Sequence, residues 1–165
     1  MLPAGNRMPG QPFLLTVAGL ALSVAGFAGL MAAFRRDASW TQTDLWRLRG
    51  IVRLSFLCMF LALAPVPLFM LVQNETLAVA ISSMLVASVY AWEGLGVLRE
   101  RAASGPALWM TAYLAMDAVL GSIQLANVVL GLPGLLMLGL LVRLAHPVGL
   151  FVEAIRSFEP PAAAS

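Results

Sequence analysis

The stretch FLLTVAGLALSVAGFAGLMAAFRR, at residues 13–36, decides the fold, because a long apolar run ends there in two adjacent arginines. Its apolar part, residues 13–34, is long enough to cross a bilayer core, which takes about 20 residues of helix. Further apolar runs occupy residues 51–72, 77–98, 107–130 and 132–152. With 61% hydrophobic and 11% charged residues, the chain is too apolar for a soluble domain of 165 residues. We therefore expect an all-α, polytopic integral membrane bundle of five transmembrane helices that forms a single membrane domain.

The arginines indicate how this bundle is oriented. The first gap between apolar runs holds or borders five of them, the third gap holds two and the C-terminal tail holds one, whereas the second and fourth gaps hold none (Arg35, Arg36, Arg47, Arg49, Arg53; Arg99, Arg101; Arg156). Cytoplasmic loops retain arginine and lysine, so the N-terminus is predicted outside and the C-terminus in the cytoplasm. The chain has no lysine, and a GC-rich bacterial genome is the simplest reason for that bias. We expect the protein in a bacterial inner membrane.

The first gap, residues 35–50, has the most distinctive sequence. Thr41 and Asp44 form a weak capping pattern, and leucines follow at helical spacing, which predicts an interfacial helix or an extension of the second span. Tryptophan and arginine side chains anchor such segments at the headgroup level, and the expected anchors are Trp40, Trp46, Arg35, Arg36, Arg47 and Arg49. The tail at residues 159–165 is rich in proline and alanine and is predicted to be disordered.

Small residues and prolines predict local features of two spans. The first span carries a row of small residues, which let helices approach closely in lipid and predict a tight helix contact there (Ala18, Gly19, Ser23, Gly26, Gly29). Pro65 and Pro67 remove backbone donors and should kink the second span. The single cysteine, Cys58, is expected to be a small buried hydrophobic residue.

Four ionisable residues fall inside the predicted spans, where a charge is costly and indicates a functional site: Glu93, Asp117, Arg143 and His146. Counted from the ends that face outside, Asp117 on the fourth span and Arg143 on the fifth lie at nearly the same depth. The short turn between these spans makes them antiparallel neighbours. The sequence therefore predicts an Asp117–Arg143 ion pair near the middle of the membrane, with Glu93 about a turn nearer the cytoplasm.

Further polar residues extend this cluster along two helices. Tyr113, Asp117, Gln124 and Asn127 share one face of the fourth span, and Arg143 and His146 share a face of the fifth. Pro147 leaves the carbonyl group of Arg143 without its helical donor. Such groups can line a small hydrated cavity, or they can simply hold helices together in lipid, and the sequence leaves both interpretations open.

No motif identifies a reaction or a ligand. The sequence lacks a nucleophile–base pair on adjacent spans, a phosphate loop and a metal motif. We therefore expect neither enzymatic activity nor a cofactor. The positive charge lies on one membrane face, which indicates lipid headgroups and not nucleic acid as its partner. The first hypothesis is a non-enzymatic accessory or structural inner-membrane subunit that assembles with a second copy or another membrane protein. The alternative is a small oligomeric transporter or channel-like protein that uses Asp117, Arg143 and His146 for proton or solute handling.

The orientation leads to a prediction that cysteine labelling can test. In a Cys58→Ser background, single cysteines at Asn74 and Leu132 should react with an impermeant reagent added to sealed cells. Cysteines at Trp40 and Gly105 should react only after the membrane is opened, because these positions face the cytoplasm. Labelling of position 105 from outside would contradict the arrangement of five spans.

Overall fold

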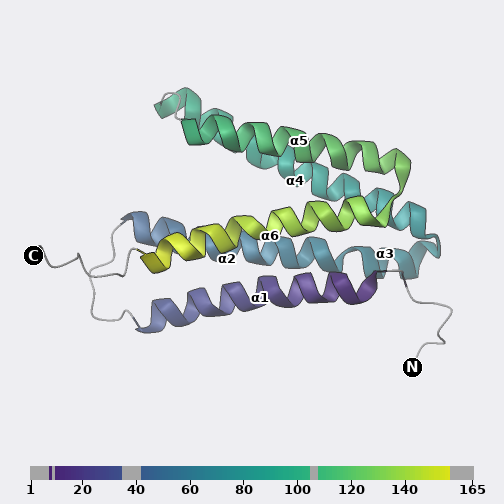
Figure 1. The fold of residues 1–165 in the computed structure, drawn as a ribbon, viewed down its shortest axis with the longest axis horizontal. Helices are drawn as coiled ribbons and strands as arrows, with labels where there is room; N and C mark the ends of the chain where they lie inside the picture. Colours follow the sequence, from purple (N-terminus) through teal and green to yellow (C-terminus); the bar gives the residue numbers. More distant parts are fainter. Residues whose placement is uncertain (1–7, 9, 35–41, 105–107, 157–165) are drawn as a thin grey trace, which may run out of the picture.

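A computed structural model describes residues 8, 10–34, 42–104 and 108–156, and all the secondary structure in these residues is α-helical (Figure 1). The helices are α1 (Gln11–Phe34), α2 (Gln42–Leu63), α3 (Pro65–Val72), α4 (Glu75–Ser104), α5 (Leu108–Leu130) and α6 (Pro133–Arg156). Within the described residues, five helical stretches are long and apolar enough to cross a membrane, and α2 and α3 together make up one of them. The expected all-α chain with five such stretches is confirmed.

The helices extend beyond several of the predicted boundaries. α2 begins at Gln42, so the later part of the first gap is an extension of the second apolar run and not a separate interfacial helix. α4 continues to Ser104 and α6 to Arg156, several residues past the apolar runs that predicted them. Charged residues near these helix ends remain compatible with a helix because their side chains can reach away from an apolar layer.

Pro65 separates α2 from α3, as the proline pair predicted. Ala64 still donates its backbone N–H to Phe60 O at 2.9 Å, and Pro65, which has no N–H group, then starts α3. Pro65 is buried, so the change of helix lies inside the bundle. The consequence is a short final segment, α3, that packs against α4 more extensively than α2 does.

Two tight turns join neighbouring helices at one end of the bundle. Gln73 adopts a left-handed conformation with φ of 53° and closes α3, and the side-chain Oδ1 of Asn74 accepts the Leu77 N–H at 3.0 Å at the start of α4. Gly131, with φ of 62°, closes α5, and a Cβ atom at this position would collide with Thr76. Glycine is therefore required at residue 131 by both its backbone conformation and the close approach of α4.

The helices form two groups (Figure 1). α4 packs mainly on α5, while α1, α2 and α6 pack on one another, with α6 more extensively on α2 than on α4 or α5. Both tight turns lie at the right of Figure 1, which we call the turn end. At the left lie the start of α2 and the ends of α4 and α6, with Arg47, Arg49, Arg99, Arg101 and Arg156, and we call this the arginine-rich end.

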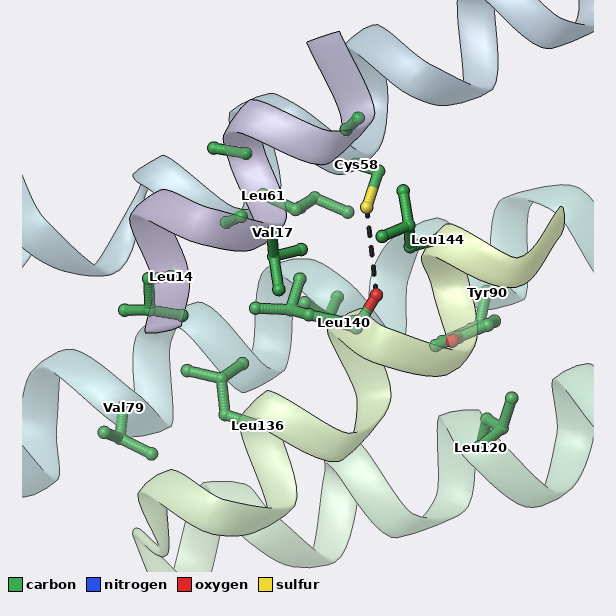
Figure 2. Packing of buried hydrophobic residues seen from close by; sticks show 14 of the residues in the cluster. Leu14, Val17, Cys58, Leu61, Val79, Tyr90, Leu120, Leu136, Leu140 and Leu144 are labelled. Carbon is green, nitrogen blue, oxygen red and sulfur yellow. Dashed lines mark hydrogen bonds between the residues drawn. The ribbon is translucent and has the colours of Figure 1, made fainter. Parts of the chain in front are cut away.

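An apolar core lies between α1, α2 and α6 and extends to Val79 of α4 and Leu120 of α5 (Figure 2). Leu136, Leu140 and Leu144 project from one face of α6 at helical spacing toward Leu14 and Val17 of α1 and Leu61 of α2. Figure 2 also shows Cys58 in this core, with its thiol directed at the carbonyl oxygen of Leu140 at 3.8 Å. The buried position of Cys58 agrees with the expected small hydrophobic residue.

The small-residue row of α1 is only partly used in this packing. Ala18 is buried, together with Ala21, Ala25 and Ala28, and these alanines form the contact face of α1. Gly19, Gly26 and Gly29 have no heavy atom within 4 Å of the position where a Cβ would stand. The expectation that the whole row makes a tight contact is therefore wrong within this chain, because α1 is rotated so that alanines, and not glycines, face α2 and α6.

Candidate functional site

Polar side chains from three helices meet where the α4–α5 pair joins α6. We call this set the polar seam: Ser83, Tyr90 and Glu93 of α4, Tyr113, Asp117, Gln124 and Asn127 of α5, and Arg143 and His146 of α6. It contains all seven of the residues that the sequence singled out as the intramembrane cluster. Ser83 and Tyr90 were not singled out, although they lie on the same helical face as Glu93 at a spacing that the sequence already contains.

At the turn end, Asn127 links all three helices. Its Nδ2 donates to Ser83 Oγ at 2.8 Å, and its Oδ1 accepts the backbone N–H of Leu132 at 2.9 Å. Both ends of this buried amide are thus hydrogen-bonded, one to α4 and one to the turn that leads into α6. Asn127 stabilises the junction, because a buried amide that lost either partner would be costly.

One and two turns further along α6, side chains from the α4–α5 pair bind its backbone. Gln124 donates from Nε2 to the carbonyl oxygen of Leu135 at 2.8 Å, and Tyr90 donates from its hydroxyl to the carbonyl oxygen of Gly139 at 3.0 Å. A Cβ atom at residue 139 would overlap the Gln124 amide. Gly139 therefore allows the close approach of the Gln124 side chain that reaches the Leu135 carbonyl group.

Arg143 is the most deeply buried charged residue of the described chain. It has no exposed side-chain surface, and its Nη2 forms an ion pair with Oε1 of Glu93 on α4. Its guanidinium carbon also lies 5.4 Å from the centre of the Tyr90 ring, within range of a cation–π interaction. Two residues of α4, one turn apart, therefore hold the guanidinium group of Arg143.

The expected Asp117–Arg143 ion pair is wrong. Equal depth on two consecutive helices does not by itself pair two side chains, and α5 contacts α6 through Gln124 and Tyr113, on either side of Asp117. Glu93 reaches Arg143 instead, since it lies on α4 and its side chain is one methylene longer than that of aspartate.

Asp117 is nevertheless part of the site. It is only 3% exposed, and neither carboxylate oxygen has a hydrogen-bond partner among the described residues. The charges of Glu93 and Arg143 both act on its carboxyl group, so it lies within electrostatic range of the ion pair. Buried polar groups in folded proteins are hydrogen-bonded in the great majority of cases, so a carboxyl group with both oxygens unpartnered at 3% exposure needs an explanation.

His146 and Tyr113 close the seam toward the arginine-rich end. Their ring centres are 4.8 Å apart with an interplanar angle of 50°, and the imidazole is half-buried. Neither ring nitrogen of His146 has a hydrogen-bond partner in the part of the chain that the structure describes. The same holds for Nε and Nη1 of Arg143, so free donors and acceptors are concentrated at this level of α6.

The site offers ionisable groups and not the ligand set of a metal. Within the described ranges, no three histidine, cysteine, aspartate or glutamate side chains gather as a group that could hold a metal ion. What the seam brings together is two carboxyl groups, one guanidinium, one imidazole and two phenols. This set is suited to binding and moving protons or to holding a small polar solute.

The expected interfacial anchors are divided between described and undescribed residues. Trp46 is 63% exposed near the start of α2, Arg49 is exposed, and Arg47 approaches Glu153 of α6 with 3.9 Å between Nη2 and Oε2. Trp40, Arg35, Arg36 and the tail at residues 159–165 lie outside the described residues. The exposed Trp46 at the arginine-rich end suits a position at the headgroup level.

Comparison with protein families, with curated proteins and with solved structures finds no match for this chain. The function must therefore be argued from the seam itself.

The ion pair leads to a prediction from double-mutant cycles. Arg143→Gln and Glu93→Gln should each lower the stability of the folded protein by about 3–5 kcal/mol, because each leaves a buried charge without its partner. The double variant should recover much of that loss. Thermal unfolding in mild detergent, followed by size-exclusion chromatography, measures the effect.

A matched cycle of Asp117→Asn with Arg143→Gln provides the control. Since Asp117 does not hold Arg143 in place, Asp117→Asn should lower the stability of the folded protein only slightly. The coupling energy in this cycle should be smaller than that between Glu93 and Arg143. A larger coupling for Asp117 than for Glu93 would contradict the arrangement described above.

Proposed function

We propose that this chain is a multi-pass protein of a bacterial inner membrane, with its N-terminus outside and the arginine-rich end in the cytoplasm. The burial pattern supports insertion in lipid, since large apolar side chains such as Leu71 and Val129 are 79% and 86% exposed while the polar seam is inside. The positive-inside rule supports the orientation, because the arginines at the described helix ends cluster at one end of the bundle.

The function we propose is the handling of protons or of a small solute at the polar seam, without enzymatic activity. One observation carries this proposal: Asp117 is buried next to a buried ion pair and has no hydrogen-bond partner in the described chain. Ionisable groups within membrane helices face the interior of a bundle or a water-filled path, where they bind protons and ions. A carboxyl group with this position is suited to the work of a small transporter or channel-like protein.

An accessory or structural subunit, the first hypothesis from the sequence, requires only the contacts that are already satisfied. The Glu93–Arg143 pair and the hydrogen bonds of Asn127, Gln124 and Tyr90 would hold α4, α5 and α6 together without any further group. Asp117 adds nothing to such a structure, because an incompletely paired polar network is less stable than an apolar one. The unpartnered carboxyl group favours proton or solute handling over that role.

The proposal can be tested with purified protein in sealed liposomes. Under an imposed membrane potential, separate assays follow the movement of protons with an internal pH-sensitive dye and of Na⁺, K⁺ and Cl⁻ with ion-selective probes. We expect flux in at least one assay and its loss in Asp117→Asn, because the substitution removes the ionisable group and keeps the size of the side chain.

Glu153→Gln is the matched control, since it removes a carboxylate of α6 that is 60% exposed at the arginine-rich end. This variant should retain the wild-type flux. If wild-type liposomes behave like empty ones in every assay, handling of protons or simple ions is contradicted and the accessory role gains support.

A further inference from the structure

The buried charges of the seam do not balance if every group is ionised. Glu93 and Arg143 cancel as a pair, so an ionised Asp117 would leave a net negative charge at a position that is 3% exposed. An uncompensated charge in an apolar surrounding is costly, and such groups take up a proton or a counter-charge. Arg143 is paired with Glu93, and Asp117 has no partner in the described chain. This arrangement therefore fits a protonated, neutral Asp117.

Arg143 has the capacity to serve a second carboxylate. A guanidinium carries five N–H donors in a fixed plane, and only Nη2 of Arg143 is used by Glu93. Nε and Nη1 have no acceptor in the described residues. Two carboxylates can supply acceptors for those free donors: the second oxygen of Glu93, Oε2, which is itself unpartnered in these residues, and Asp117, whose carboxyl group lies within electrostatic range of the guanidinium.

We propose that the polar seam binds one proton at the carboxyl group of Asp117, and that the free N–H donors of Arg143 receive the Asp117 carboxylate when that proton leaves. The inference rests on the proposed function, since it names the ligand of the same site. In the release step the O–H bond of Asp117 breaks, the proton passes to water, and the carboxylate accepts hydrogen bonds from Nε or Nη1. Uptake reverses these changes, while Nη2 of Arg143 remains on Glu93 throughout.

The surroundings of Asp117 favour a proton over a metal cation. The charged and titratable groups that interact electrostatically with Asp117 are Tyr90 and Glu93 of α4, Tyr113 of α5 and Arg143 of α6, and His146 lies beyond them against the Tyr113 ring. Ca²⁺ takes at least about six oxygen ligands, far more than one carboxyl group supplies. A proton needs only one carboxyl oxygen.

The order of groups along the seam indicates with which side of the membrane Asp117 exchanges its proton. Tyr113 lies one helical turn from Asp117 toward the arginine-rich end, and its ring contacts the half-buried His146. With both ring nitrogens unpartnered, His146 can accept a proton at one nitrogen and pass it on from the other. We therefore infer exchange between Asp117 and the cytoplasmic side of the membrane.

Isotope labelling of the full-length protein in lipid nanodiscs tests the proposal directly. The chain contains three aspartates, at residues 37, 44 and 117, so labelling the aspartate side-chain carboxyl carbon with ¹³C marks Asp117 and only two others. Infrared difference spectra recorded across a pH titration separate the neutral acid from the carboxylate. We expect one labelled carboxyl group that titrates apart from the other two and that is lost in Asp117→Asn.

Asp44→Asn is the matched control, because Asp44 lies in the first turn of α2 at the arginine-rich end. It should leave the separate titration in place. Glu93→Gln should move the midpoint of that titration toward lower pH, since Asp117 then becomes the only carboxylate available to Arg143. If the separate titration is absent from the wild type, survives Asp117→Asn, or keeps its midpoint in Glu93→Gln, the proposal is overturned.

The infrared titration and the liposome assay test separate claims, so either can give a negative result without the other. A titrating Asp117 without any flux supports the proton site and contradicts transport through the seam. Flux that depends on Asp117 without its separate titration supports solute handling and contradicts the proton as the ligand.

Discussion

Burying the guanidinium group of Arg143 requires an opposite charge at the same depth, and this requirement determines how α4 meets α6. Glu93 supplies the charge and Tyr90 supplies both a ring face and a hydrogen bond to α6, one turn away on the same helix. α5 then follows α4, on which it packs most extensively. α5 is also joined to α6 directly, because Gln124 donates to the Leu135 carbonyl oxygen and the ring of Tyr113 contacts that of His146.

α6 has a double role that its sequence makes possible. One face carries Leu136, Leu140 and Leu144 into the apolar core shared with α1 and α2 (Figure 2). The other face carries Gly139, Arg143 and His146 into the seam, where the missing side chain at residue 139 exposes backbone carbonyls to the α4–α5 pair. The α4–α5 pair contributes Val79 and Leu120 to the same apolar core, and it also brings polar side chains to the backbone of α6. Polar contacts depend on alignment and hydration, so this second interface is the place where a proton could change the structure.

The sequence predicted the helices better than it predicted their contacts. Residue counts found the five apolar stretches, Pro65 marked the change from α2 to α3, and helical periodicity placed Tyr113, Asp117, Gln124 and Asn127 on one face of α5. Chain order suggested that α6 would pack on α5, but apolar burial brings it to α2 and leaves Arg143 to Glu93. The role of Gly139 could not be predicted, because a glycine matters for packing only if another side chain approaches its backbone closely, and the sequence does not show which one does. Tyr90 and Ser83 could have been found by applying to α4 the same periodicity that was applied to α5.

The central claim is that Arg143 is held by α4 while Asp117 is free of it. A density map of the protein in lipid nanodiscs at acidic pH, at a resolution that shows side chains, tests this claim most directly. The guanidinium group of Arg143 should be joined to the carboxylate of Glu93 and stacked near the ring of Tyr90, with the carboxyl group of Asp117 separate from both. A map in which Arg143 is paired with Asp117, and the side chain of Glu93 points toward the arginine-rich end, would contradict the account.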